Sequence, residues 1–249
     1  MSALILALVA GGVVGLALGA LGGGGSVLAV PALIYLLGFS PAAATTASLI
    51  IVTATSATAL YAHAWDGNVV WKTGALFAAA GVVPAFLAGA AAEHLPAAVL
   101  TAAFAVIAAL AAVRMLRPSH AEPPERIRPA TAAGAGAGLG AVTGFLGVGG
   151  GFLAVPALVG ALGLRMKQAV GTSLLVITVN SLAALTARAG ADGDLRWEVI
   201  APFTGAAILG AWDGKRLAAK ITGASLQRIF AFVLLGVAAL MLADVIVRS

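Results

Sequence analysis

Apolar residues dominate the chain and fall into ten segments separated by short polar or glycine-rich breaks. Long apolar runs predict helices, and about 20 such residues span a bilayer. The pattern therefore predicts an all-α polytopic membrane protein. The segments of the first half cover residues 3–21, 25–38, 41–63, 72–92 and 96–116. Those of the second half cover residues 130–147, 150–163, 167–187, 197–213 and 224–246.

The second and seventh segments are the shortest. Each follows a cluster of glycines and has 14 residues, whereas a full crossing needs about 20. We expect short, glycine-broken helices that either re-enter the membrane or cross it with their glycine ends at membrane depth.

A phrase that occurs twice divides the chain into two halves. Residues 19–33 read GALGGGGSVLAVPAL and residues 144–158 read GFLGVGGGFLAVPAL, with 11 of 15 positions identical at an offset of 125. Such self-similarity indicates a fused duplication. We expect a first repeat of five membrane segments at residues 1–116 and a second repeat of five at residues 130–249. The charged, proline-rich stretch at residues 117–129 is the expected cytoplasmic linker.

The distribution of Lys and Arg predicts orientation, because cytoplasmic loops carry an excess of both residues. If all ten segments cross and the linker is cytoplasmic, 11 of the 14 Lys and Arg residues lie inside, and only Arg188, Arg196 and Arg248 lie outside. If the two short segments re-enter instead, the split becomes eight to six. We therefore expect ten crossings with both termini outside. Five crossings per repeat is an odd number, so the repeats are then inverted, a common transporter plan. A parallel eight-span protein with two re-entrant loops is the alternative.

The composition supports a membrane protein and excludes several other classes. Hydrophobic residues make up 61% of the chain and charged residues 9%, far below the roughly 25% of soluble domains. The net charge of +5 then reflects cytoplasmic loops. No basic stripe with interleaved aromatic residues occurs, so we expect no nucleic-acid partner. The absence of cysteine excludes disulfides, thiol catalysis and Cys-ligated metals.

The glycine clusters at residues 22–25 and 147–151 are candidate binding elements. Unwound backbone at membrane depth is tolerated where it lines a cavity. The helix that follows each cluster begins near Ser26 or Phe152 and presents free N–H groups and partial positive charge. Two such helix starts facing each other bind an anion without a buried cation. Close helix packing by small residues is the alternative.

Polar residues recur in the third and eighth segments, where residues 45–60 align without gaps to residues 170–185. Their hydroxyl and amide groups can line a polar route or complete the hydrogen bonds of an anion. The alternative is that Ser and Thr bond to their own backbone or across helices. The aligned pairs are Ser48 with Ser173, Thr53 with Thr178, Thr55 with Asn180, and Ser56 with Ser181. The candidate substrate-binding residues of these segments are Ser48, Thr53, Ser173, Thr178 and Asn180.

Titratable residues fall at or near the expected helix ends. The lack of an acid at the midplane argues against a cation pump and fits an anionic or neutral substrate. His63 and His94 fall near the interfaces, where we expect solvated side chains; a proton relay at His63 is the alternative. No catalytic motif or metal-ligand cluster occurs. We expect a protein that is not an enzyme and has no catalytic residue, metal or cofactor.

At these residues the chain resembles the sulfite exporter (TauE/SafE) family of membrane permeases. The resemblance covers nearly the whole length and rests on GALGGGGSVLAVPALIYLLG followed by TTASLIIV, and on GFLGVGGGFLAVPALVGALG followed by AVGTSLLVI. It implies transport of small sulfur anions such as sulfite and sulfonates, or of other small organic anions, in the cytoplasmic (inner) cell membrane. It also implies a substrate between the repeats. The residues matched to that site are Gly24, Gly25, Ser26, Gly149, Gly150 and Gly151.

We therefore expect a secondary transporter that exports sulfite or an organosulfur or sulfonate anion by alternating access between two inverted repeats. Because Ser26 is replaced by Gly151 in the second copy, the two half-sites differ, which suits an asymmetric substrate. An anion channel-like pore and an uptake permease for another small organic anion are the alternatives. The expected partners are the small anionic substrate and the lipid bilayer. The oligomeric state stays open, with a homodimer as one option.

Overall fold

A computed structural model describes residues 2–92, 97–116, 128–146, 151–187 and 195–248. Within these ranges the chain forms ten α-helices and one π-helical turn, and no strand. The prediction of an all-α fold is confirmed.

Each expected apolar segment contains a helix. The helices of the first half are α1 (Ser2–Leu21), α2 (Gly24–Pro31), which continues into the π-helical turn η1 (Ala32–Leu36), α3 (Pro41–Trp65), α4 (Trp71–Ala92) and α5 (Ala97–Leu116). Those of the second half are α6 (Pro129–Leu146), α7 (Gly151–Gly160), α8 (Met166–Ala187), α9 (Trp197–Ala219) and α10 (Gly223–Arg248). The ninth segment was expected to end at residue 213, but α9 continues to Ala219 because its charged residues do not break a helix.

Local sequence explains several helix boundaries. Ser40 precedes α3 and its Oγ accepts from the Ala43 backbone N–H at 3.3 Å, and Pro41 stands at the first helical position, where it needs no hydrogen-bond donor. Gly22 ends α1 with a φ of 68°, and Gly163 has a φ of 65° before α8. Only glycine adopts this region readily.

Within the described ranges, five helices are long and apolar enough to cross a membrane. They are Ala3–Leu21, Ala43–Trp65, Trp71–Ala88, Met166–Thr186 and Gly223–Leu240. By contrast α2 has 8 residues and α7 has 10, well short of the roughly 20 of a full span. The chain is therefore polytopic, and its short helices coincide with the glycine-broken segments.

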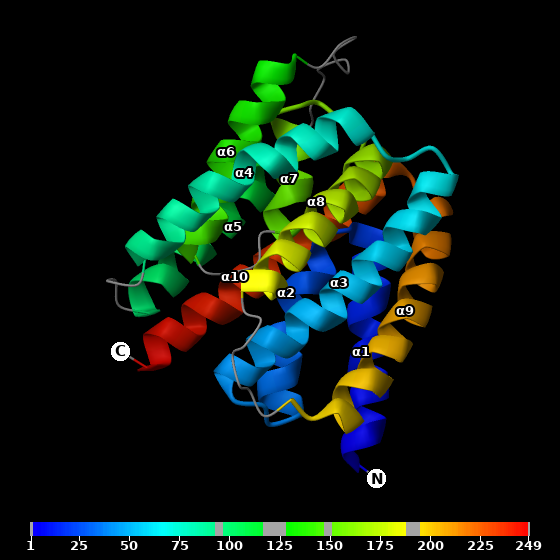
Figure 1. The fold of residues 1–249 in the computed structure, drawn as a ribbon, viewed down its shortest axis with the longest axis vertical. Coiled ribbons are helices and arrows are strands. Elements are labelled where there is room, and N and C mark those ends of the chain that lie inside the picture. The colour runs from blue at the N-terminus through cyan, green and yellow to red at the C-terminus, as the bar shows by residue number, and fades with distance from the viewer. Residues whose placement is uncertain (1, 93–96, 117–127, 147–150, 188–194, 249) are drawn as a thin grey trace.

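Helices α1 and α9, which come from different halves of the chain, pack backbone against backbone. Three glycines of α1 lie against the backbone of α9: Gly11, Gly15 and Gly19. A Cβ atom added to Gly15 would overlap the backbone of Ala207. Because these contacts advance together along both helices, α1 and α9 run parallel (Figure 1). From the other side of the interface, Gly214 of α9 packs against the Leu16 backbone of α1.

A second close pair, α4 with α6, repeats this arrangement. Gly136 lies against the backbone of Phe77, and Gly140 lies against Gly81, so these helices are also parallel. In the first pair, Gly11 lies against Phe203. Gly136 follows Gly11 by 125 residues, and Phe203 follows Phe77 by 126. Corresponding glycines of the two halves therefore pack on corresponding phenylalanines, each in the opposite half.

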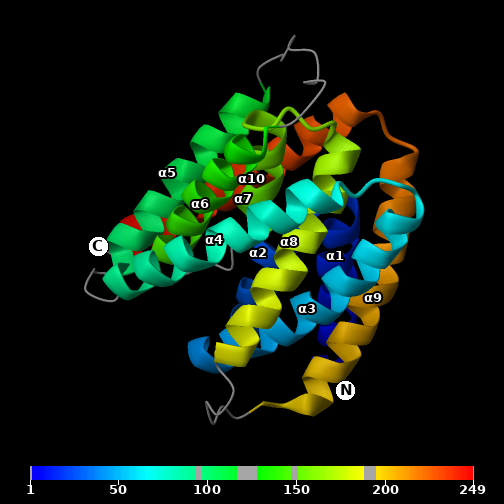
Figure 2. The same ribbon diagram turned by 45° about the horizontal axis from the view of Figure 1, so that its top comes forward.

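The remaining contacts fix the directions of α3 and α8. Arg196, just before α9, donates to the Leu37 carbonyl before α3, and Lys215 near the end of α9 donates to the Ala62 carbonyl near the end of α3. These two helices are thus parallel. The Val70 N–H, just before α4, donates to Thr172 Oγ1 near the start of α8 at 3.1 Å. Since only residues 66–70 separate α3 from α4, α8 starts where α3 ends, and the two cross in opposite directions (Figures 1 and 2).

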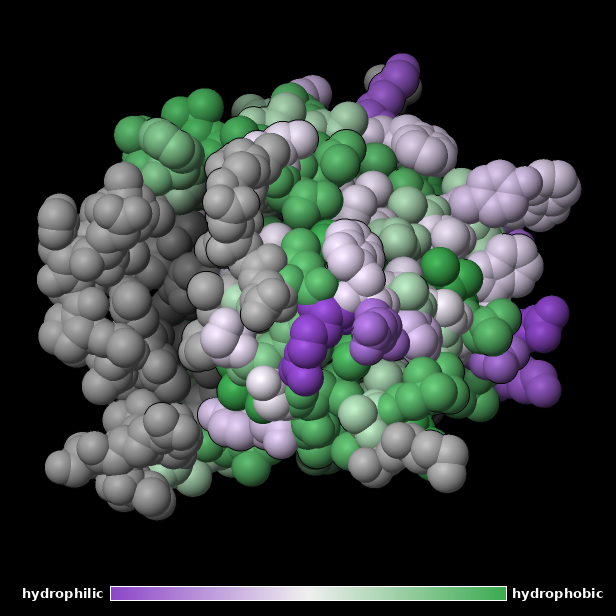
Figure 3. Space-filling model, turned by 60° about the horizontal axis from the view of Figure 1, so that its bottom comes forward, coloured by the Kyte–Doolittle hydropathy of each residue, from purple (hydrophilic) through white to green (hydrophobic). Residues whose placement is uncertain are grey.

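The surface suits lipid. Large apolar side chains such as Phe86, Leu110 and Leu240 are exposed, whereas Phe77, Phe203 and Phe230 are fully buried. In the coloured part of the face in Figure 3, hydrophobic and intermediate residues predominate, and strongly hydrophilic ones gather in a few clusters. In water such a surface would drive association.

Two glycines of α6 provide a matched test of the close packing. We expect Gly136→Ala to lower the free energy of unfolding by about 1–3 kcal/mol, because the added Cβ overlaps the Phe77 backbone. Gly138→Ala, whose Cβ would meet open space, should leave stability unchanged. Thermal unfolding of detergent-purified protein measures both, and equal effects of the two substitutions would contradict the packing described.

Candidate functional site

Polar side chains meet where α3 crosses α8, near the middle of both helices. The Thr178 hydroxyl of α8 lies 2.9 Å from Ser56 Oγ of α3, and the side chain of Ser56 is fully buried. Ser56 donates to the Thr53 carbonyl at 3.3 Å, and Thr178 lies 2.7 Å from the Leu174 carbonyl oxygen. The bond between Thr178 and Ser56 links α8 to α3, and the other two lie within one helix each.

Three polar atoms beside this bond have no partner among the described residues. Thr53 Oγ1, Thr55 Oγ1 and Asn180 Oδ1 are all buried without a hydrogen bond. Leaving a buried polar group unpaired costs about 1–3 kcal/mol, so each such group calls for an explanation. Thr55 and Asn180 are also counterparts in the two aligned segments. The crossing therefore has free hydrogen-bonding capacity at matching positions of both halves.

The hydroxyl groups of Ser48 and Ser173 are used differently. Ser48 donates to the Thr45 carbonyl and Ser173 to the Val170 carbonyl, both at 2.8 Å within their own helices, and both residues are buried. Both serines therefore follow the alternative expectation, in which Ser and Thr bond to the backbone of their own helix. A substrate contact at Ser48 or Ser173 stays a prediction.

The first glycine cluster packs against α8. At Gly22 a Cβ would collide with Ser173 Oγ and lie 3.3 Å from the Val170 carbonyl oxygen, so this break fits only as glycine. Gly24, Gly25 and Ser26 form the first turn of α2 directly after it. Ser173 and Asn180 are seven residues apart on α8, or about 10 Å of helix rise. The start of α2 thus lies near the same helix that carries Asn180.

The second glycine cluster is described only in part. Gly151 is the first residue of α7, and Gly149 and Gly150 lie outside the described residues. The short helices α2 and α7 contact each other, and α7 also packs on α8. The two short helices therefore lie side by side, and α7 lies next to α8.

Neither α3 nor α8 brings a charged side chain to the crossing. No Asp, Glu, Lys or Arg occurs on α3, and α8 carries only Lys167, near its start. Among the described residues, no group of three His, Cys, Asp or Glu side chains is placed to hold a metal ion. What the crossing offers a ligand is hydroxyl groups and an amide, which donate without adding charge.

One site residue and one burial were not anticipated. Thr55 was not among the predicted binding residues, although its match to Asn180 was a usable signal. His63 was expected to be solvated, but this is wrong: its side chain is 4% exposed. It faces α1, where Nε2 lies 3.1 Å from the Gly19 carbonyl oxygen. A position one turn from a helix end was mistaken for an exposed one because helix rotation was unknown.

Comparison with known proteins decides the family. Residues 7–241 match the family model described as sulfite exporter TauE/SafE. The chain belongs to this family. It is also 37% identical over 245 residues to a "Probable membrane transporter protein" of Xylella fastidiosa (strain 9a5c), covering 94% of this chain and 93% of the relative. A protein of the same description from strain Temecula1 / ATCC 700964 is 36% identical over the same shares. No solved structure matches.

This TauE/SafE family member is thus a multi-pass membrane transporter. Most of the chain, including both glycine clusters and both polar segments, lies inside the matched range.

Two Thr→Val substitutions test whether the unpaired groups are kept for a ligand. We expect Thr55→Val to leave the ligand-free protein equally or more stable. The substitution removes an unpaired buried hydroxyl, whose desolvation costs about 1–3 kcal/mol of folding free energy. Thr178→Val should lower stability by about 1 kcal/mol, because it breaks the bond to Ser56. Thermal unfolding without added anion measures both; a loss with Thr55→Val as large as with Thr178→Val would mean that Thr55 bonds within the protein.

Proposed function

We propose that this protein is a secondary transporter of a small anion, which binds where α3 crosses α8. The observation that carries the proposal is the pair of unpartnered, buried polar groups at Thr55 and Asn180, at corresponding positions of the two halves. An anion fits such a site because hydroxyl and amide donors replace its hydration shell. The terminal amide of Asn180 can turn over to present its NH2 group in place of Oδ1.

The proposed mechanism is alternating access between two inverted repeats, residues 1–116 and 130–249. The opposite directions of α3 and α8 and the exchanged glycine contacts of α1–α9 and α4–α6 support it. All ten segments then cross the membrane, with the linker at residues 117–129 in the cytoplasm. Sites in such transporters lie at the repeat interface near the midplane, where the α3–α8 crossing falls in this scheme.

The proposed substrate is sulfite or an organosulfur or sulfonate anion, and the proposed direction is export across the cytoplasmic membrane. The family description names sulfite exporters. The uncharged crossing binds one negative charge without a competing carboxylate. The helix starts at Gly24 and Gly151 add partial positive charge. When the membrane potential is negative inside, it favours export of a monoanion by about 2.3 kcal/mol per 100 mV, so export needs no coupling ion.

Flux into proteoliposomes tests the function. We expect purified protein to move sulfite or a sulfonate, with counterflow that marks a carrier. Asn180→Leu should lower the flux about 10- to 100-fold at low substrate, the effect of losing one hydrogen bond to a charged group. Thr186→Val is the matched control on the same helix, because Thr186 is exposed and bonds only to the Ala183 carbonyl among the described residues.

The outcomes separate the alternatives. Flux far above carrier rates without counterflow would indicate a channel-like pore. Flux of another organic anion in preference to sulfur anions would change the substrate but keep the site. No flux of any anion, or equal flux in Asn180→Leu and the control, would contradict the proposal.

A further inference from the structure

His63 is a buried titratable group that binding at the α3–α8 crossing does not use. It lies in the last turn of α3, and its ring reaches the end of α1, where Nε2 lies 3.1 Å from the Gly19 carbonyl oxygen. A carbonyl only accepts, so Nε2 carries the proton. Nδ1 is then a bare acceptor, and it is buried without a partner among the described residues.

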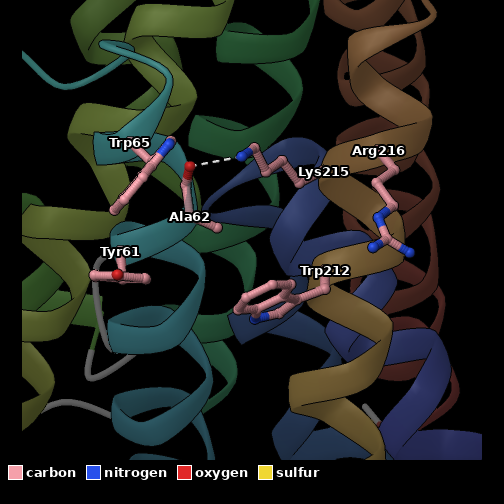
Figure 4. Close-up of a pocket in the computed structure, with 6 residues that line it drawn as sticks. All are labelled: Tyr61, Ala62, Trp65, Trp212, Lys215 and Arg216. Carbon is pink, nitrogen blue, oxygen red and sulfur yellow. Dashed lines mark hydrogen bonds between the residues drawn. The ribbon is translucent and has the colours of Figure 1, made fainter.

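An ion pair next to His63 ties α3 to α9. Lys215 Nζ lies 2.8 Å from Asp66 Oδ2 and 2.6 Å from the Ala62 carbonyl oxygen. Asp66 follows α3 directly and Ala62 is one turn earlier, so this one ammonium group holds the end of α3. Figure 4 shows Lys215 reaching across to Ala62 beside a pocket of about 410 Å³, with Tyr61 and Trp65 on one side and Trp212 on the other.

The charges around His63 are few. The charges of Lys215 on α9 and of Asp66 in the turn after α3 both act on its ring. From α1 it faces only the Gly19 carbonyl, because Ser2–Leu21 contains no titratable side chain. Asp66 is three residues after His63, a spacing that places two side chains on one face of a helical turn.

We propose that His63 is the proton-binding residue of this transporter, and that its protonation releases α3 from α9 by drawing the Asp66 carboxylate away from Lys215. The proposal rests on the transport function proposed above. The proton comes from water at the Asp66 end of the bundle and binds the Nδ1 lone pair. Nε2–H keeps its bond to Gly19.

The physical reason is competition for one carboxylate. A protonated ring carries a buried charge and a new N–H donor, both of which need an acceptor. Asp66 supplies the carboxylate whose charge acts on the ring, and that carboxylate is now paired with Lys215. The added positive charge also repels Lys215. At the far end, Arg196 still binds the Leu37 carbonyl, so the helices part at one end only.

Spin labels across the pocket test the movement directly. The chain has no cysteine, so Tyr61→Cys and Trp212→Cys give two defined label sites on α3 and α9. We expect the label separation, measured by electron paramagnetic resonance, to increase on acidification. It should not respond to pH when His63→Gln is added, since Gln can donate to Gly19 but binds no proton. Asp66→Asn, which removes the carboxylate, should abolish the response as well. A separation that ignores pH with His63 in place would overturn the proposal, as would an unchanged response in either variant.

Anion flux gives an independent measurement. With His63, flux should rise by about tenfold per pH unit as the Asp66 side is acidified, until the group is fully protonated. His63→Gln should flatten this profile, whereas His120→Gln, in the expected linker, should leave it unchanged. Flux that depends on pH equally in His63→Gln would refute coupling through His63 yet leave transport established. If no anion is moved at all, transport itself is refuted and the label distances still decide the His63 step.

Discussion

The contact of backbone with backbone at glycine, between α1 and α9 and between α4 and α6, determines the positions of the other helices. In lipid, apolar side chains gain little from burial against one another, so helices associate through close packing. Gly15 and Gly140 allow this approach because a side chain at either position would overlap the facing backbone. Each pair takes one helix from each half, so the halves interlock instead of standing side by side.

This interlocking brings α3 and α8 together. Arg196 and Lys215, before and within α9, bond to backbone carbonyls near the two ends of α3. Thr172 of α8 accepts from the Val70 N–H just before α4. Between these fixed ends the helices cross at Ser56 and Thr178. Beside that crossing, hydroxyl and amide groups are buried without hydrogen-bond partners, which lowers the stability of an otherwise closely packed structure. In a structure otherwise held by close contact, such a cost is the natural mark of a functional site.

The sequence was sufficient to predict the helices and most of their boundaries to within a few residues, because hydropathy and glycine clusters act locally; the end of α9 was placed six residues too early. It also singled out Asn180, since an amide within an apolar run is conspicuous. It did not separate Thr55, which is unpaired, from Ser48, which bonds to its own helix. That difference depends on helix rotation, which only neighbouring helices determine. The burial of His63 was missed for the same reason. Nor does sequence distance suggest that Lys215 meets Asp66, since packing of α9 along α3 brings them together.

The pairing of α1 with α9 has a consequence for how the protein is made. Gly11 and Phe203 are separated by 191 intervening residues, so α1 enters the membrane long before its partner is synthesised. Until then its glycine face has only lipid beside it, and the same holds for α4 until α6 follows. Contacts so distant in sequence form late and slowly. Helix α1 must therefore persist in the bilayer without the helix that covers its glycine face, exposed to quality-control proteases until α9 arrives.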